Sequence, residues 1–179
     1  AANSQPFSHI HQPGIAVGGH CIPVYPKFYM ASDTGCNLPA VSVEINESMP
    51  VRAIDMLKAE ISSLNGKRIA ILGAAYRGGV KETAFSGVFP LAVEIEKLGG
   101  IPVVHDPMFS AEELNKFGLL SFELKEHCDL AIVQADHEIY ANLTAEDLPG
   151  VSHLFDGRNI VNKTKLAPIN VIRLGDGTR

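Results

Sequence analysis

The sequence has little of several features that mark common classes of protein. Its three cysteines, Cys21, Cys36 and Cys128, are odd in number and widely spaced, and no Cys-x-x-Cys pair occurs. Neither a zinc site nor a disulfide framework is therefore indicated, and reduced thiols in the cytoplasm fit best. No apolar run approaches the roughly 20 residues of a membrane-spanning helix, so we expect no membrane partner.

Basic residues are also few, and they are not clustered. The formal net charge is −5 at pH 7, and the chain contains no basic run. A nucleic acid is therefore not an expected partner, because binding to its phosphates needs a cluster of Lys and Arg. The 179 residues, of which 46% are hydrophobic and 20% charged, are enough for one good core, or for one domain with an appendage.

Two further absences concern cofactors and metals. No Gly-x-Gly-x-x-Gly follows a predicted strand, although dinucleotide-binding domains carry this fingerprint in the turn that holds the pyrophosphate. A generic NAD-binding domain is therefore disfavoured, and we assign no cofactor-binding residue in this chain. His9, His11 and His20 are expected to be solvated rather than metal-bound, because no carboxylate or cysteine completes a set at ligand spacing.

A long periodic segment covers residues 38–64. Its apolar stripe recurs every three or four residues and consists of Ile45, Met49, Ala53, Leu57, Ile61 and Leu64. This spacing predicts an amphipathic helix that needs a partner surface. Pro50 removes one backbone donor, so we expect the helix to kink or restart there, with Asn46 or Ser48 as a cap.

After residue 66, short apolar runs alternate with helical patterns. The expected strands are residues 68–73, 101–105, 130–134, 152–155 and 171–174, and the expected helices between them include 86–98 and 111–117. Such alternation predicts an α/β fold with a parallel, Rossmann-like sheet of about five strands. Ligands of these sheets bind beyond the carboxyl ends of the strands.

That edge of the predicted sheet gathers three candidate ligand-binding side chains. Tyr76 and Arg77 follow the first strand, and Arg158 follows a later strand. The planar guanidinium of arginine suits phosphate because it binds oxygen pairs. Tyr76 would stack on a base or cover a sugar. For Arg77 alone, the alternative is a surface salt bridge.

A second candidate is the loop of residues 14–26, whose centre is Cys21. Gly18 and Gly19 precede the cysteine, where they let the backbone approach a ligand closely with amides free to donate. Three prolines stiffen the segment on both sides of the thiol. A cysteine in such a loop is a candidate nucleophile, which acts as the thiolate. The alternative is a small buried cysteine in a turn.

Three blocks of residues carry a resemblance to a known family. Residues 12–24 read Gln-Pro-Gly-Ile-Ala-Val-Gly-Gly-His-Cys-Ile-Pro-Val, residues 69–83 read Ile-Ala-Ile-Leu-Gly-Ala-Ala-Tyr-Arg-Gly-Gly-Val-Lys-Glu-Thr, and residues 155–158 read Phe-Asp-Gly-Arg. In this order, they resemble three parts of the UDP-glucose/GDP-mannose dehydrogenase family: its nucleophile loop, the start of its nucleotide-sugar-binding domain, and its Asp-Gly-Arg. The branch that they most resemble oxidises UDP-N-acetylhexosamines.

The resemblance implies an organisation for the chain. It would be the C-terminal portion of a longer enzyme, with residues 1–64 as the remnant of a central helical domain that carries the nucleophile loop. Residues 65–179 would form the UDP-sugar-binding, Rossmann-like domain. NAD would bind to a domain outside this chain, so the fragment would be inactive alone. The long helix would form much of a homodimer interface.

The resemblance also implies a reaction. A UDP-N-acetylhexosamine would be oxidised at its C6 alcohol to the uronate, with NAD+ as the hydride acceptor. Cys21 would add to the intermediate aldehyde as a thiohemiacetal, and the thioester that forms next would be hydrolysed by water. The substrate-binding residues would be Gly18, Gly19, Tyr76, Arg77 and Arg158.

Three departures from the family pattern bear on activity. Tyr25 stands where the family has an Asp four residues after the cysteine, Ala84 stands in place of an Arg, and Phe7 in place of another. A phenol is neutral at pH 7 unless its pKa is shifted, so Tyr25 does not replace a carboxylate base. The alternative function is therefore a nucleotide-sugar-binding module without chemistry.

Overall fold

The computed structural model describes residues 2–4, 6, 10–33, 35–175 and 177 of the chain. Its centre is a sheet of five strands in the order β2-β1-β3-β4-β5. The strands are β1 (Arg68–Leu72), β2 (Ile101–His105), β3 (Leu130–Val133), β4 (His153–Asp156) and β5 (Asn170–Arg173). All neighbouring strands are parallel, which confirms the predicted α/β, Rossmann-like sheet.

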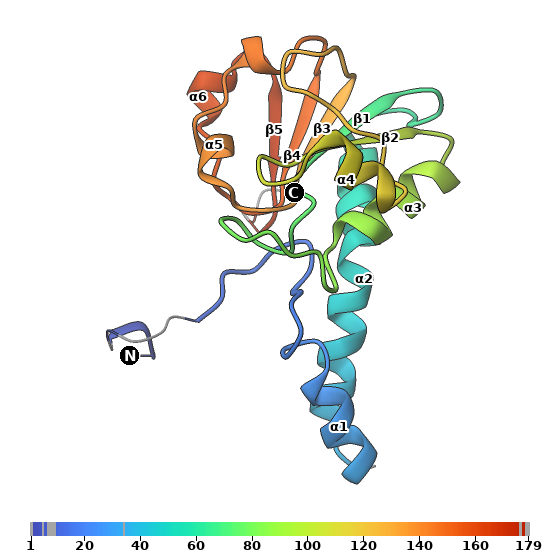
Figure 1. The fold of residues 1–179 in the computed structure, drawn as a ribbon, viewed down its shortest axis with the longest axis vertical. Coiled ribbons are helices and arrows are strands. Elements are labelled where there is room, and N and C mark those ends of the chain that lie inside the picture. The colour runs from blue at the N-terminus through green and yellow to red at the C-terminus, as the bar shows by residue number, and fades with distance from the viewer. Residues whose placement is uncertain (1, 5, 7–9, 34, 176, 178–179) are drawn as a thin grey trace.

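Helices flank this sheet on both faces (Figure 1). The α-helices are α1 (Tyr25–Ser32), α2 (Asn37–Glu60), α3 (Val88–Lys97), α4 (Ala111–Lys116), α5 (Glu138–Ala141) and α6 (Lys163–Leu166), and the 3-10 turns are η1 (Ala2–Ser4) and η2 (Ala145–Asp147). On one side of the sheet lie α3 and the upper part of α2, while α5 and α6 lie on the other side. This arrangement buries the strands on both faces.

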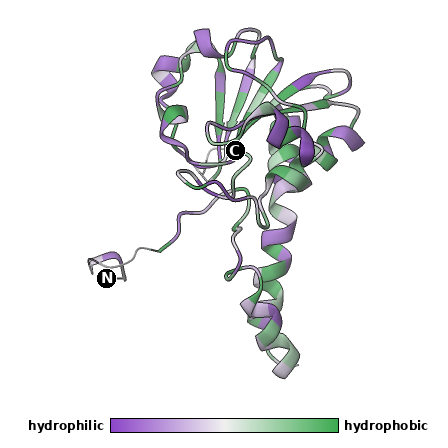
Figure 2. Cartoon of the chain, viewed as in Figure 1, coloured by the Kyte–Doolittle hydropathy of each residue, from purple (hydrophilic) through white to green (hydrophobic). Residues whose placement is uncertain are grey.

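The strands are short apolar runs because both of their faces are covered. In β1, Ile69 and Ile71 belong to a core cluster shared with α2 and α3, whereas Ala70 and Leu72 belong to a second cluster shared with α5 and α6. All four are fully buried. A parallel strand that is buried on both faces reads as a continuous hydrophobic run, which is why the pattern predicted it. The hydrophobic strands are visible at the centre of Figure 2.

The helix α2 is a single element of 24 residues, about 36 Å long at 1.5 Å per residue. Its C-terminal half packs on the sheet through Ala53, Ile54 and Leu57, which are fully buried. Its N-terminal half projects beyond the domain (Figure 1). The expectation of a restart at Pro50 is wrong, because the buried Pro50 lies inside the helix. Nor does Asn46 cap a helix: its side chain accepts from the Val17 amide (2.8 Å).

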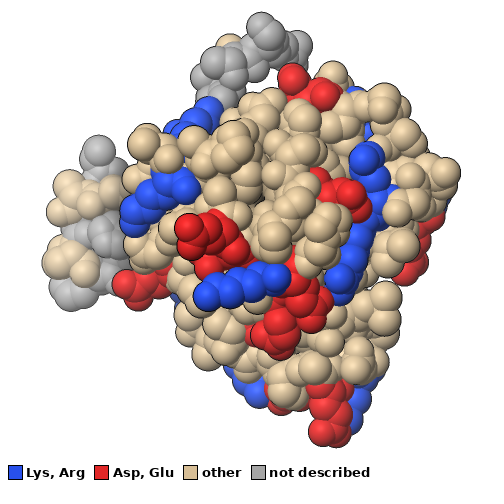
Figure 3. Space-filling view, turned by 90° about the horizontal axis from the view of Figure 1, so that it is seen from above, with Lys and Arg blue, Asp and Glu red and all other residues tan. Residues whose placement is uncertain are grey.

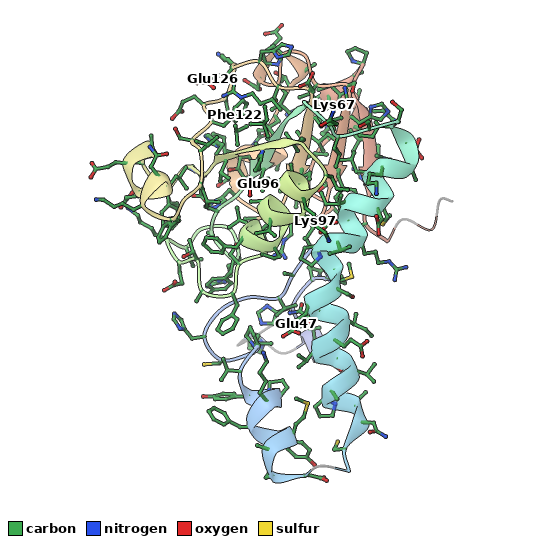
Figure 4. The ribbon with its side chains drawn as sticks, turned by 90° about the vertical axis from the view of Figure 1, so that its right-hand side faces the viewer. Glu47, Lys67, Glu96, Lys97, Phe122 and Glu126 are labelled. Carbon is green, nitrogen blue, oxygen red and sulfur yellow. The ribbon has the colours of Figure 1, made fainter. Side chains whose placement is uncertain are left out.

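The short helix α1 lies beside the projecting half of α2. Figure 4 shows the two side by side, with Glu47 labelled on α2, and Glu47 pairs with Lys27 of α1 at 3.1 Å. The aromatic rings of α1 are not buried: Phe28 is 66% exposed and Tyr29 is 52% exposed. This pair of helices therefore presents apolar surface away from the sheet.

The charged surface is mixed. Seen from above, basic and acidic side chains are interspersed over the face shown in Figure 3, without a broad basic patch there. Several of these charges pair with one another, such as Arg68 with Glu126 at 2.7 Å. Within the described residues, no helix is both long enough and apolar enough to cross a membrane.

Candidate functional site

The segment that leads to Cys21 crosses beneath the carboxyl ends of the strands (Figure 1). Gly18 and Gly19 are buried against the loop that follows β1. A Cβ at Gly18 would lie 2.5 Å from the Tyr76 Cβ, so only glycine allows this approach. Gly19 has φ +91° and donates its amide to the Ala84 carbonyl at 2.8 Å. The Gly19 amide is therefore engaged within the protein rather than free for a ligand.

A cavity of about 750 Å³ opens between this segment and the edge of the sheet. The structure brings all six residues predicted for the site to its lining: Gly18, Gly19, Cys21, Tyr76, Arg77 and Arg158. Four further lining residues carry polar side chains that the sequence reasoning did not assign to a ligand: His11, Gln12, His20 and Asp136. The cavity is large enough for a nucleotide-sized molecule, because ligand pockets measure roughly 300–1,000 Å³.

The loop after β4 positions Arg158. Asp156, fully buried at the end of the strand, accepts from the amides of Arg158 (3.2 Å), Ile160 (3.2 Å) and Val161 (3.0 Å). These bonds fold the loop back so that the Arg158 side chain, only 11% exposed, points along the cavity wall. Gly14 lies against it, and a Cβ there would overlap the guanidinium. Asp156 is therefore a structural residue, and the Arg158 side chain lines the cavity.

The loop after β1 positions Tyr76 and Arg77. Arg77 is exposed, and its guanidinium carbon lies 6.0 Å from the centre of the Tyr76 ring. Among the described residues it forms no ion pair, so the alternative of a surface salt bridge is not seen there. Arg77 thus contributes an uncompensated positive charge to the cavity.

Asp106, which follows β2, fixes the backbone of that loop. Its Oδ2 accepts from the amides of Ala74 (2.8 Å) and Ala75 (2.9 Å), and its Oδ1 accepts from the amide of Met108 (2.9 Å). Burial alone would raise the pKa of Asp106, but the hydrogen bond to His137 and the backbone amides outweigh it and lower the pKa. Asp106 is therefore an ionised anchor for the loop.

His137 completes this anchor from the loop after β3. It is buried, and its Nε2 lies 3.0 Å from Asp106 Oδ2. The Gly79 amide donates to its Nδ1 at 3.4 Å, so the proton of a neutral ring belongs on Nε2, which donates to Asp106. His137 therefore holds the loops after β1, β2 and β3 together at the rim of the cavity.

Cys21 is exposed and lies at the start of the turn that leads into α1. Its carbonyl accepts from the amides of Val24 (3.1 Å) and Tyr25 (2.9 Å). These bonds place Tyr25 one helical turn after Cys21. The Cys21 thiol, as a hydrogen-bond partner and as a neighbouring charge, raises the pKa of Tyr25 above its ordinary value of about 10. The phenol next to the thiol is therefore neutral at pH 7.

A contact between His20 and Glu82 ties the Cys21 loop to the loop after β1. The His20 Nε2 lies 3.1 Å from Glu82 Oε2, while Glu82 Oε1 accepts from the amides of Thr83 (2.9 Å) and Ala84 (3.0 Å). The hydrogen bond with His20, followed by the amides, lowers the pKa of Glu82. Ala84, at the place of a family arginine, contributes only its backbone here.

The remaining candidates are the histidines of the N-terminal segment. Within the described part of the chain, no three side chains of His, Cys, Asp and Glu gather at ligand distances. His20 pairs with Glu82, and His11 lines the cavity. His9 and Phe7 lie outside the described residues.

Together, the sheet order and the cavity at the carboxyl ends of its strands define a Rossmann-like ligand-binding domain. Residues 70–163, more than half of the chain, match the UDP binding domain of the UDP-glucose/GDP-mannose dehydrogenase family. The chain belongs to this family.

Individual relatives carry a more specific description. The chain is 30% identical over 186 residues to a UDP-N-acetyl-D-mannosamine dehydrogenase of Methanocaldococcus jannaschii, covering 98% of this chain and 42% of the relative. It is 31% identical over 188 residues to the protein of the same description from Pyrococcus horikoshii, with the same coverage of 98% and 42%. The chain thus spans less than half the length of these relatives.

Solved structures agree with the fold. A structure of UDP-D-ManNAc dehydrogenase from Pyrococcus horikoshii superimposes with a TM-score of 0.75 at 27% identity, covering 98% of this chain and 43% of that one. The native structure of the UDP-N-acetyl-mannosamine dehydrogenase Cap5O from Staphylococcus aureus gives a TM-score of 0.70 at 25% identity, with coverages of 98% and 41%. These similarities extend over the long helix as well as the sheet, since nearly the whole chain is covered.

Proposed function

We propose that this chain is the UDP-sugar-binding portion of a nucleotide-sugar 6-dehydrogenase and that Cys21 is its nucleophile. The observation that carries the proposal is a cavity that is lined both by an exposed thiol and by two arginines from separate loops. Membership of the family and the descriptions of the relatives support a UDP-N-acetylhexosamine as substrate.

In this proposal, each side of the cavity has a separate task. Arg77 and Arg158 bind the diphosphate, because their planar guanidinium groups match pairs of phosphate oxygens. Tyr76 covers the base or the sugar with its ring. Gly18 and Gly19 have no side chain, and this lets the Cys21 loop lie against the loop after β1. The sugar then extends from the arginines toward the thiol.

The chemistry that we propose for Cys21 begins at the aldehyde. The thiolate forms a bond to the C6 carbon, the carbonyl electron pair moves to oxygen, and that oxygen takes up a proton to give a thiohemiacetal. A later thioester, formed by loss of hydride, is hydrolysed by water to the carboxylate and the free thiol. The oxidations need a hydride acceptor, which we propose to be NAD.

This chain does not itself fit NAD. The turn after β1 reads Gly73-Ala74-Ala75-Tyr76-Arg77, without the glycine pattern that lets a backbone approach the pyrophosphate of a dinucleotide. We therefore place NAD on a part of the longer relatives that these residues do not match, and we expect the chain alone to show no dehydrogenase activity.

The assembly and compartment are also proposals. The uncovered apolar faces of α1 and α2 support a homodimer through the long helix. The cytoplasm is supported by the cysteines, because Cys21, Cys36 and Cys128 are all free thiols.

Calorimetry tests the binding part of the proposal. We expect the chain to bind UDP, and Arg158→Ala to weaken this binding by about tenfold or more, because a hydrogen-bonded charge pair is lost. Arg52→Ala serves as a matched control, since Arg52 is exposed on α2 and outside the cavity. Binding of NAD without binding of UDP would reverse the assignment.

The second candidate function is a nucleotide-sugar-binding module without chemistry. Tyr25 favours it, because a neutral phenol stands where the family carries a carboxylate. Both candidates predict binding of UDP, but they differ in the reactivity that they require of the Cys21 thiol.

A further inference from the structure

Asp136 lies at the point of the sheet where the chain changes direction. From β1 the chain continues to β2 on one side, while β3 lies on the other side of β1. In doubly wound sheets the loops on either side of such a switch point separate and leave a crevice for a ligand. Tyr76 and Arg77 border this crevice from β1, and Asp136 borders it from β3. Asp136 therefore lines the crevice from a central position.

Two hydrogen bonds fix the carboxylate of Asp136. Its Oδ1 accepts from the Gly78 amide at 2.8 Å and from Nη2 of Arg158 at 2.9 Å. The Gly78 backbone approaches so closely that a Cβ there would overlap the Asp136 carbonyl. The side chain is nevertheless 41% exposed. Both of these bonds go to Oδ1, and an ionised carboxylate has about four acceptor sites, so acceptor capacity remains for a further donor.

The charge of Asp136 is unusual for a site that binds only phosphate. Burial alone would raise the pKa of Asp136, but the Gly78 amide and the Arg158 charge outweigh it and lower the pKa, so the carboxylate is ionised at pH 7. An ionised carboxylate beside Arg158 repels phosphate oxygens and occupies one donor that they would use. It attracts groups that donate hydrogen bonds, such as hydroxyls.

We propose that Asp136 is a specificity-determining residue of the cavity: it accepts hydrogen bonds from sugar hydroxyls of the ligand and disfavours phosphate groups that carry no such donors. The inference rests on the proposed function, since it assumes that a nucleotide sugar occupies the cavity. It extends that function by naming the residue that distinguishes a sugar-bearing diphosphate from a simple one.

The test compares two ligands by calorimetry, UDP and inorganic pyrophosphate. Asp136→Asn keeps the shape and one acceptor oxygen but removes the charge. We expect its affinity for UDP to fall about tenfold, because a hydrogen bond from a hydroxyl to a charged acceptor is weakened. Its affinity for pyrophosphate should rise, because the competing carboxylate charge is gone. The two dissociation constants should therefore move in opposite directions.

Glu138→Gln is the matched control, since Glu138 is exposed two residues away and does not line the cavity. It removes the same charge and should leave both affinities within about twofold. If Asp136→Asn weakens both ligands equally, Asp136 only positions Arg158, and the inference is overturned. Unchanged affinities would also overturn it. Failure of the unaltered chain to bind UDP would instead refute the proposed function.

Discussion

At the scale of single residues, the three thiols provide the most direct test of the chemistry. Burial raises the pKa of Cys128 to about 11, so about one thiol in a thousand is ionised at pH 8. Cys21 is exposed and Cys36 is partly exposed. We expect iodoacetamide to label Cys128 only after unfolding. If Cys21 is catalytic, it should react at pH 6.5 at least about tenfold faster than Cys36.

Mass spectrometry of the cysteine peptides after timed labelling measures these rates. Cys21→Ser is the control that assigns the fast reaction to one residue. Equal rates for Cys21 and Cys36 would favour the binding module without chemistry. Rapid labelling of Cys128 in the folded protein would contradict the burial that the structure gives it.

The residue scale also shows what a sequence pattern can and cannot reveal. Cys21 was predicted from the motif of its loop, and Arg77 and Arg158 were predicted because they follow the carboxyl ends of strands. All three line the same cavity. Asp136 was missed because its local sequence is that of any surface aspartate. Its partners, Arg158 and Gly78, lie 22 and 58 residues away, and only the folded sheet brings them together.

At the scale of the elements, Asp106 joins the carboxyl ends of neighbouring strands. It holds the loop after β1 by the amides of Ala74 and Ala75, and it holds the loop after β3 by His137. We expect Asp106→Asn to lower the free energy of unfolding by about 2 kcal/mol at pH 7, because buried donors lose a charged acceptor. Urea unfolding followed by circular dichroism measures the difference.

The same carboxylate makes a prediction about pH. Because its pKa is lowered in the folded state, its stabilisation is present above the unfolded pKa of about 3.9 and is lost as the pH falls through the folded value. The difference in the free energy of unfolding between the unaltered chain and Asp106→Asn should therefore become smaller below pH 4. Asp55→Asn is the control, since Asp55 is 63% exposed and pairs with Lys58 on the helix surface. A difference in the free energy of unfolding that stays constant down to the lowest pH would contradict this account.

The helices show where tertiary packing overrides the structure that the local sequence predicts. The strands and α3 follow the predicted segments closely because their apolar residues are buried by the sheet itself. The expected restart at Pro50 does not occur, since Pro50 is buried inside a continuous helix, beside Ala53 and Ile54. The helical turn that follows Pro50 packs on the core, and these contacts outweigh the one backbone hydrogen bond that proline removes. A local sequence pattern does not reveal such contacts.

At the scale of the whole molecule, α1 covers only part of the projecting half of α2, and the described residues leave apolar side chains exposed there. Leu38, Val41 and Ile45 recur at helical spacing and are 76%, 48% and 55% exposed. The predicted stripe is thus divided: from Ala53 onward it packs on the core, whereas its first residue, Ile45, is exposed together with the preceding Leu38 and Val41. Contiguous exposed apolar surface marks an interaction site.

A second copy of the chain is the partner that we propose for this surface. Two α2 helices packed together with α1 would bury an interface of the size that stable dimers need, on the order of 1,000 Å² or more. We therefore expect the chain to sediment as a dimer, and the double variant Leu38→Glu with Ile45→Glu to shift it toward a monomer, because charges would be buried without partners. Sedimentation velocity over a wide range of concentrations measures both.

Val93→Glu is the matched control, since Val93 is 62% exposed on α3, away from the projecting half of α2. It places a charge on a comparable apolar position and should leave the dimer intact. A chain that remains monomeric at the highest concentration would contradict the dimer and leave the apolar face to a further part of a longer protein. A dimer that resists the double variant would show that another surface joins the two copies.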